Sequence, residues 1–131
     1  MTRGADFCGL ANTDGADTIM SSHIKFSKWE VYNGDDSISI KANSTNITIT
    51  DSVLHDGLGI ALGSIGQYYQ EFEYIEDVHV NNIHFDNTLH AAYVKTWTDD
   101  RNGYPPNGGG GGLGCKISTI PINCRRSVDE S

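Results

Sequence analysis

HIKFSKWEVYNGDD (23–36) is followed by two segments with the same pattern, NITITDSVLHDGLG (46–59) and DVHVNNIHFDNTLH (77–90). When the segments are aligned, apolar residues recur at three positions, which are Ile24, Ile47 and Val78, then Phe26, Ile49 and Val80, and then Val31, Leu54 and Phe85. The alternation of apolar residues at i and i+2 is typical of a β-strand. The break that follows predicts a turn and a second strand, and we expect Trp29, at the start of that second strand, to lie in the core.

A third short strand is predicted after each pair, as SISIK (37–41), GIALG (59–63) and AYVKTW (92–97). The first two units are 23 residues apart, from Ile24 to Ile47, and the next is 31 residues on, at Val78, because SIGQYYQEFEYIE inserts a longer loop. Repeats of this length without helical periodicity indicate a β-solenoid, in which stacked units bury one continuous core. Leucine-rich repeats and a β-sandwich compete with this interpretation. The first would need the LxxLxLxxN pattern, and the second would need hairpin turns at regular spacing.

The composition limits the classes of partner and cofactor. The chain has 131 residues, enough for one domain, and its net charge of −8 disfavours nucleic-acid binding. No apolar stretch reaches the length of a membrane span, and no signal peptide is visible. The three cysteines, Cys8, Cys115 and Cys124, have no CxxC spacing, so we expect no zinc, and a Cys115–Cys124 bridge is left open. Asn43 and Asn46 each begin an N-glycosylation sequon, which weakly favours secretion.

Two acidic turns, NTDG (12–15) and NGDD (33–36), are about one repeat apart. In a solenoid such turns stack, so the carboxylates of Asp14, Asp35 and Asp36 should converge. Repulsion should then raise at least one pKa, and a protonated acid beside an ionised one is what glycoside hydrolysis uses. A spacing of about 5–9 Å would fit both retaining and inverting geometry. Ordinary Asx-turns and stacked Asn12 and Asn33 are the structural alternative, and an EF-hand calcium site is disfavoured because its ligand pattern is missing.

Four motifs, NTDG (12–15), NGDD (33–36), GIALGSIGQY (59–68) and YVKTW (93–97), occur in the order seen in glycoside hydrolase family 28, and the resemblance covers about residues 6–114. The resemblance implies a right-handed parallel β-helix and inverting hydrolysis of pectic polysaccharide. It also implies that Asp35 is the general acid and that Asp14 and Asp36 activate water. Lys95 would bind a uronate carboxylate, Asn12 and Tyr93 would also contact substrate, and no cofactor or metal is expected.

The sequence departs from the family pattern at three positions. Leu58 stands where polygalacturonases carry His, Tyr93 stands where they carry Arg, and Ser37 stands where a Cys usually follows the two aspartates. Rhamnogalacturonan-acting members also lack that His and Arg, and residues 93–114 resemble fungal exo-acting members. The resemblance therefore indicates an exo-acting, extracellular and monomeric pectin hydrolase, with galacturonate or rhamnose at the cleavage subsite.

The repeat ends before the chain does. We expect residues 1–114 to form about four coils of a longer β-helix and residues 115–131 to form a tail outside the pattern. The glycine run at 107–114 is expected to be a flexible loop beside the cleft, since no GK[ST] follows as in a phosphate loop. The alternative to an active enzyme is an inactive fragment or a carbohydrate-binding remnant. A lyase is disfavoured because no motif contains an arginine base.

Overall fold

The computed structural model describes residues 11–97, 100–101, 103–113 and 122–123. Every regular element within these ranges is a β-strand, and every strand pairing is parallel. The prediction of an all-β chain with parallel sheets is therefore confirmed. The same ranges contain no helix with the length and hydropathy that crossing a bilayer would require.

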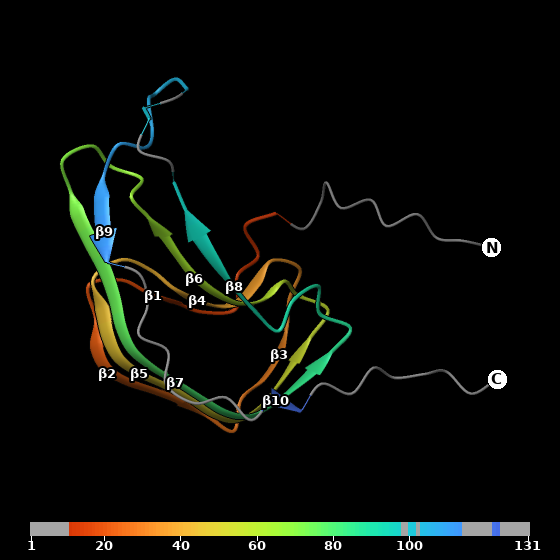
Figure 1. Ribbon diagram of the computed structural model, residues 1–131. Helices are drawn as coiled ribbons and strands as arrows, with labels where there is room; N and C mark the ends of the chain where they lie inside the picture. Colours follow the sequence, from red (N-terminus) through yellow and green to blue (C-terminus); the bar gives the residue numbers. More distant parts are fainter. Residues whose placement is uncertain (1–10, 98–99, 102, 114–121, 124–131) are drawn as a thin grey trace, which may run out of the picture.

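The strands form two main stacks. One stack has the order β1-β4-β6-β8, and its strands are β1 (Asp17–Thr18), β4 (Asp36–Ile40), β6 (Gly59–Ile65) and β8 (Ala92–Thr96). The other has the order β2-β5-β7-β10, and its strands are β2 (Ser22–Ser27), β5 (Ser44–His55), β7 (Phe72–Asp86) and β10 (Ile122–Asn123). Two shorter strands add to the second stack, since β3 (Glu30–Tyr32) pairs with β5 and β9 (Gly111–Leu113) pairs with β7. The two stacks face each other across the core (Figure 1).

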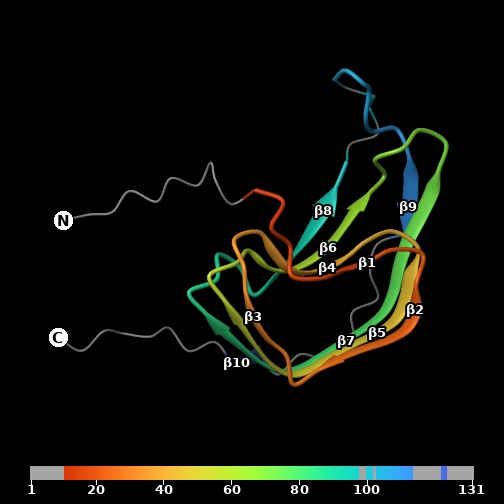
Figure 2. The ribbon, with the colours of Figure 1, turned by 180° about the vertical axis from the view of Figure 1, so that it is seen from behind.

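The predicted repeat alignment is the observed strand register. Ile24 pairs with Ile47, and Ile47 pairs with Val78, so the steps of 23 and 31 residues each carry the chain forward by one coil. The two later apolar positions also match, with Phe26, Ile49 and Val80 in one row and Val31, Leu54 and Phe85 in another. Figure 2 shows that β2, β5 and β7, which carry these residues, lie over one another in the second stack.

The predicted turn inside each unit is a bend made by a single residue. Lys28, Asp51 and Asn82 occupy the same place in three successive coils, and their φ angles are 61°, 53° and 54°. Asn and Asp tolerate this left-handed region better than most residues. The Asn82 side-chain amide also donates a hydrogen bond to Asp51 Oδ1 at 2.7 Å. β5 and β7 continue through the bend, whereas the first coil divides there into β2 and β3.

The core lies between the stacks and consists of apolar side chains from the inner faces of the strands. Aliphatic residues dominate it, and rows of like residues repeat from coil to coil, as is expected where each unit buries its apolar face against its neighbours. The residues with no more than 2% exposure include Ile38, Ile40, Ile47, Ile49, Leu54, Ile60, Leu62, Ile75, Val78 and Ile83.

Two expectations from the sequence are corrected. Trp29 is 40% exposed rather than part of the core. Its ring packs edge-on against the Phe26 ring, with 4.9 Å between the ring centroids. Trp29 lies in the break between β2 and β3, in the first of the three repeat units. The equivalent residues of the next two units, Ser52 and Ile83, are buried. The glycine run is not a free loop, because Gly108 N and Gly110 N donate to carbonyl oxygens of the 66–68 segment and β9 follows.

The C-terminal segment, residues 115–131, contains β10, which pairs in parallel with β7 through Ile122 and Ile83. The remainder of that segment and residues 1–10 lie outside the described residues. Cys8, Cys115 and Cys124 all lie outside the described residues, so a Cys115–Cys124 bridge stays open.

Ile49→Ala is expected to lower the free energy of unfolding by about 2–5 kcal/mol, because it removes a fully buried side chain from the row of Phe26 and Val80 and leaves a cavity. The matched control is Thr48→Ala, on the opposite face of the same strand, where the side chain is only partly buried. Chemical denaturation followed by circular dichroism measures both. Equal effects of the two substitutions would contradict the assignment of the inner face.

Candidate active site

Backbone and side-chain amides hold the two acidic turns together. Gly15 N donates to the carbonyl oxygen of Asp36 at 2.9 Å. The Asn33 side-chain amide donates to the carbonyl oxygens of Thr13 at 3.1 Å and of Asp35 at 2.6 Å, so one side chain spans both turns. The first turn is thereby fixed directly on the second, and the Asn33 side chain has a structural role between them.

The contact between these turns is too close for a side chain at position 15. A Cβ atom on Gly15 would lie 2.3 Å from the carbonyl oxygen of Ser37, which is a backbone atom that cannot move aside cheaply. The next coil also reaches the site, because Leu58 N donates to the carbonyl oxygen of Asp35 at 2.7 Å. Leu58 is therefore next to the acidic turns, but it brings no ionisable group.

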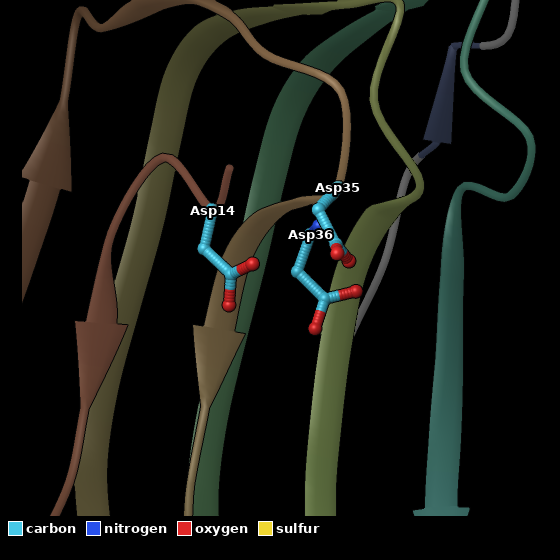
Figure 3. Close-up of side chains that lie close together, drawn as sticks. All are labelled: Asp14, Asp35 and Asp36. Carbon is cyan, nitrogen blue, oxygen red and sulfur yellow. Dashed lines mark hydrogen bonds between the residues drawn. The ribbon is translucent and has the colours of Figure 1, made fainter. Parts of the chain in front are cut away.

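The three predicted acids converge. One carboxylate oxygen from each of Asp14, Asp35 and Asp36 lies within 4.8 Å of the other two. Figure 3 shows Asp14 on one coil and Asp35 and Asp36 on the next. Backbone amides orient Asp35, since its Oδ2 accepts from Asn12 N at 2.7 Å and its Oδ1 accepts from Asp36 N at 2.9 Å.

Asp36 is buried, with 1% exposure, and both of its oxygens have donors. Lys95 Nζ lies 2.5 Å from Oδ2, and the Tyr93 hydroxyl donates to Oδ1. Both partners come from β8, the second strand beyond β4 in the same stack. The structure therefore brings Lys95 and Tyr93 to the acids and shows them bound to Asp36, while their contact with substrate stays a prediction.

The charges of the site move the pKa of Asp14. Burial raises it, and the neighbouring carboxylates of Asp17, Asp35 and Asp36 raise it further. The expectation that repulsion would raise at least one pKa is confirmed for this residue. Its side chain is 23% exposed, so Asp14 is more accessible than Asp36.

The partners of Asp36 are also perturbed. Burial and the hydrogen bond to Asp36 raise the pKa of Tyr93 to about 12, so the phenol stays neutral near pH 7. Burial acts to lower the pKa of Lys95, but the hydrogen bonds with Asp36 and Tyr93 outweigh it, and the pKa lies above its usual value. Asp36 is therefore held by one cation and one neutral hydroxyl.

Lys41 is a second cation of the site, and the motif analysis missed it. Its Nζ lies 2.6 Å from Asp17 Oδ2 and 3.9 Å from Asp14 Oδ2. The hydrogen bond with Asp17 raises the pKa of Lys41. A signal was present in the sequence, because the repeat pairs Asp17 with Ser39 and so places Lys41 diagonally opposite Asp17 on the same face.

The acids line a cavity of about 340 Å³. Asn12, which was predicted to bind substrate, lines it together with the three aspartates and Lys95. Tyr93, also predicted to contact substrate, is not in the lining, and its hydroxyl donates to Asp36. The sequence analysis did not identify the other polar residues of the wall, which are Lys41, Ser64, Gln67 and Glu73. Tyr68 also lines the cavity, and it is 56% exposed.

The acidic cluster alone does not indicate a metal centre. Each of the three aspartates offers one carboxylate oxygen to the cluster, whereas Ca²⁺ takes about six to eight oxygen ligands. Lys95 already supplies a positive charge to Asp36. The donor set therefore suits acid–base chemistry better than cation binding.

Other predicted residues lie away from the cavity. Asn46 is exposed, while Asn43 is half-buried and its Oδ1 accepts from Tyr74 N at 3.2 Å. Their glycosylation stays a prediction. The His55 ring stacks on the Tyr32 ring with 4.0 Å between centroids, and His55 Nδ1 lies 2.9 Å from Asp86 Oδ2. His55 therefore does not substitute for the family histidine whose position Leu58 occupies.

Asp14→Asn is expected to stabilise the fold at pH 7. A carboxyl whose pKa is raised by folding destabilises the folded state once it ionises, and it contributes no penalty below its unfolded value of 3.8. The gain should therefore be present at neutral pH and disappear as the pH falls below that value. Thermal unfolding across this pH range measures it. Asp77→Asn, at an exposed carboxylate of β7, is the control, and a gain independent of pH would refute the assignment.

Comparison with known proteins places this geometry in a family. The chain is 57% identical over 114 residues to alpha-L-rhamnosidase rgxB of Aspergillus niger, covering 87% of this chain and 27% of that protein. It is 39% identical over 104 residues to an exopolygalacturonase of Cochliobolus carbonum, covering 79% of this chain and 23% of that protein. It is also 39% identical over 120 residues to exopolygalacturonase X of Aspergillus niger, covering 90% of this chain and 28% of that protein.

The chain thus spans about a quarter of the length of the curated relatives it matches. No solved structure matches it. The family model described as glycosyl hydrolases family 28 matches residues 2–103, which include all three aspartates and Lys95. The chain therefore belongs to glycosyl hydrolase family 28.

Proposed function

We propose that this protein hydrolyses glycosidic bonds in pectic polysaccharide, acting from the chain end with inversion at the anomeric carbon. The observation that carries the proposal is the convergence of Asp14, Asp35 and Asp36 in one cavity of a family 28 chain. The names of the relatives, a rhamnosidase and exopolygalacturonases, support the substrate class and exo action. An extracellular location follows from such a substrate, and sequons at Asn43 and Asn46 are compatible with it.

The proposed scaffold is a right-handed parallel β-helix of about four coils. The four strands of the β1-β4-β6-β8 stack and the matched register of the second stack support it. Right-handed connections between parallel strands are strongly preferred, which agrees with the family resemblance. We assign the coils to residues 1–114 and treat residues 115–131 as a tail that joins them through β10.

In this mechanism Asp35 is the general acid that protonates the leaving oxygen. Two backbone amides, Asn12 N and Asp36 N, each bind one of its oxygens and fix the orientation of the carboxyl group. General acid catalysis depends on such fixed geometry between the acid and the leaving group. Asp35 also lines the cavity, so a bound sugar can reach it.

Asp14 and Asp36 then activate the attacking water in different ways. Asp14 is partly exposed and has a raised pKa, which brings its basicity closer to that of an effective general base. Asp36 is buried and bound by Lys95 and Tyr93, so its part is to orient the water and hold negative charge beside Asp14. Lys95 supplies positive charge to Asp36 at 2.5 Å, while Asp14 accepts the proton from the water.

The family resemblance, rather than the carboxyl spacing, supports inversion. Inverting enzymes usually separate their two carboxyl groups by about 6.5–9.5 Å to admit a water molecule. The nearest oxygens of this triad approach within 4.8 Å. The stereochemistry therefore needs a direct measurement.

A carbohydrate-binding protein without turnover is the second candidate function. It is favoured by the occupation of both Asp36 oxygens and by Leu58 and Tyr93 at positions where the family resemblance expects His and Arg. Binding of pectic oligosaccharides without release of reducing sugar would favour this candidate.

Asp35→Asn is expected to lower kcat by about 10²–10⁴-fold, because the amide cannot donate an acidic proton to the leaving group. Reducing-sugar release from rhamnogalacturonan and polygalacturonate oligosaccharides measures the loss. Asp77→Asn should leave the rate unchanged, because that carboxylate is exposed and does not line the cavity. An Asp35→Asn protein that is folded and fully active would remove Asp35 from the mechanism.

Proton NMR of the first product should show the anomer opposite to that of the substrate. Water that attacks from the face opposite the leaving group inverts the anomeric carbon in a single displacement. The spectrum must be recorded before mutarotation equilibrates the anomers. An initial product with retained configuration would instead require a covalent intermediate on one of the aspartates.

A further inference from the structure

Asp17 acts on Asp14 although it lies outside the cavity. It begins β1, close behind the first acidic turn, and it does not line the cavity. Burial raises the pKa of Asp14 most, and among the neighbouring carboxylates Asp17 raises it more than Asp35 or Asp36 does. The strongest charge effect on this acid therefore comes from a side chain that the proposed mechanism does not use.

Lys41 is shared unequally between these two carboxylates. Its Nζ donates a hydrogen bond to Asp17 Oδ2 at 2.6 Å, and it lies 3.9 Å from Asp14 Oδ2. The first distance is that of a charge-assisted hydrogen bond, whereas the second is too long for one. The ammonium group is thus bound by Asp17 and lies beside Asp14 without being bound to it.

The backbone fixes this arrangement. Lys41 N donates to the carbonyl oxygen of Thr18 at 2.8 Å, which anchors the lysine on the coil that carries Asp17. β1 and β4 pair in parallel register immediately before it. Lys41 therefore cannot move along the stack without breaking the pairing of the first two coils. Its side chain is 38% exposed, so the ammonium group can still turn towards either carboxylate.

No other lysine within residues 11–97 forms an ion pair with Asp14. The charged groups around Asp14 are the carboxylates of Asp17, Asp35 and Asp36, the cations Lys41 and Lys95, and Glu73 elsewhere in the cavity wall. Lys95 is already bound to Asp36 at 2.5 Å. The position of one ammonium group, that of Lys41, therefore decides how much positive charge Asp14 receives.

We propose that Asp17 is a positioning residue of this site, which keeps Asp14 able to accept a proton by holding Lys41. The inference rests on the proposed role of Asp14 as the base. Without Asp17, the ammonium group would be free to bind Asp14 directly, and a carboxylate bound by a cation is a weaker base. Without Lys41, Asp14 would face the neighbouring acids with no cation beside it, and it would hold its proton more tightly.

The first test measures the ionisation of Asp14 directly. ¹³C NMR of the full 131-residue chain follows the carboxyl carbons against pH, and the Asp14 signal is the one that Asp14→Asn removes. Asp17→Asn should shift its titration midpoint downwards by about 0.5–1 pH unit, and Lys41→Met should shift it upwards by a similar amount. No shift in either variant, or a shift in the other direction, overturns the inference. Circular dichroism checks folding, and Lys41→Gln replaces Lys41→Met if that variant unfolds.

The second test asks whether Asp17 acts through Lys41. In a double-mutant cycle, the downward shift caused by Asp17→Asn should be about twofold smaller in the Lys41→Met background, because no ammonium group is left to move to Asp14. Equal shifts in both backgrounds would mean that Asp17 acts by its own charge alone, which overturns the positioning role. Lys41→Arg keeps the cation and should leave the midpoint near that of the unmodified chain. Lys25→Met, at an exposed lysine of β2 outside the cavity wall, is the matched control.

Activity is measured separately, as the pH dependence of kcat/KM for reducing-sugar release from rhamnogalacturonan and polygalacturonate oligosaccharides. In the proposed mechanism the rate falls at acidic pH as Asp14 takes up a proton, so the acidic limb should move with the NMR midpoint in each variant. A merely structural role of Asp17 would lower the rate without moving that limb. The expected NMR shifts without turnover would refute the proposed function and leave the role of Asp17 intact. Turnover with unchanged NMR midpoints would refute the role of Asp17 and support the function.

Discussion

Parallel pairing in matched register is the constraint on which the rest of this structure depends. Each strand of a stack hydrogen-bonds through its backbone to its parallel neighbours, so a residue's position in the repeat fixes its place in space. Gly15 N and the Asn33 side chain extend this pairing into the turns. Asp14 and Asp35, which are distant in sequence, therefore occupy one site without any dedicated contact between their side chains.

Such stacking brings like charges together at a cost. Two unit charges 4.8 Å apart repel by about 3 kcal/mol at an effective dielectric constant of roughly 20. The structure offsets part of this repulsion with Lys95 on Asp36 and Lys41 on Asp17, and it leaves Asp14 with a raised pKa. Asp14 is partly exposed and keeps an unfavourable charge environment, which is typical of sites that keep reactivity at the expense of stability.

Tyr93 and Leu58 show how one scaffold accepts different sites. Both lie where the family resemblance expects ionisable side chains, and both still make the contacts that hold the turns, through the Tyr93 hydroxyl and Leu58 N. The backbone of the stack therefore survives changes in the chemistry of the wall.

The sequence by itself determined the strand repeat, its register and the convergence of the three aspartates, because parallel stacking converts spacing in the chain directly into proximity. It did not determine where side chains at the edges of the repeat go. Trp29 lies at the surface, and the glycine run pairs with the 66–68 segment, since both depend on which neighbour covers them. Only the tertiary structure decided that Lys95 and Tyr93 hold Asp36. Such pairs form between side chains on different coils, and their geometry depends on packing across several strands rather than on any local pattern.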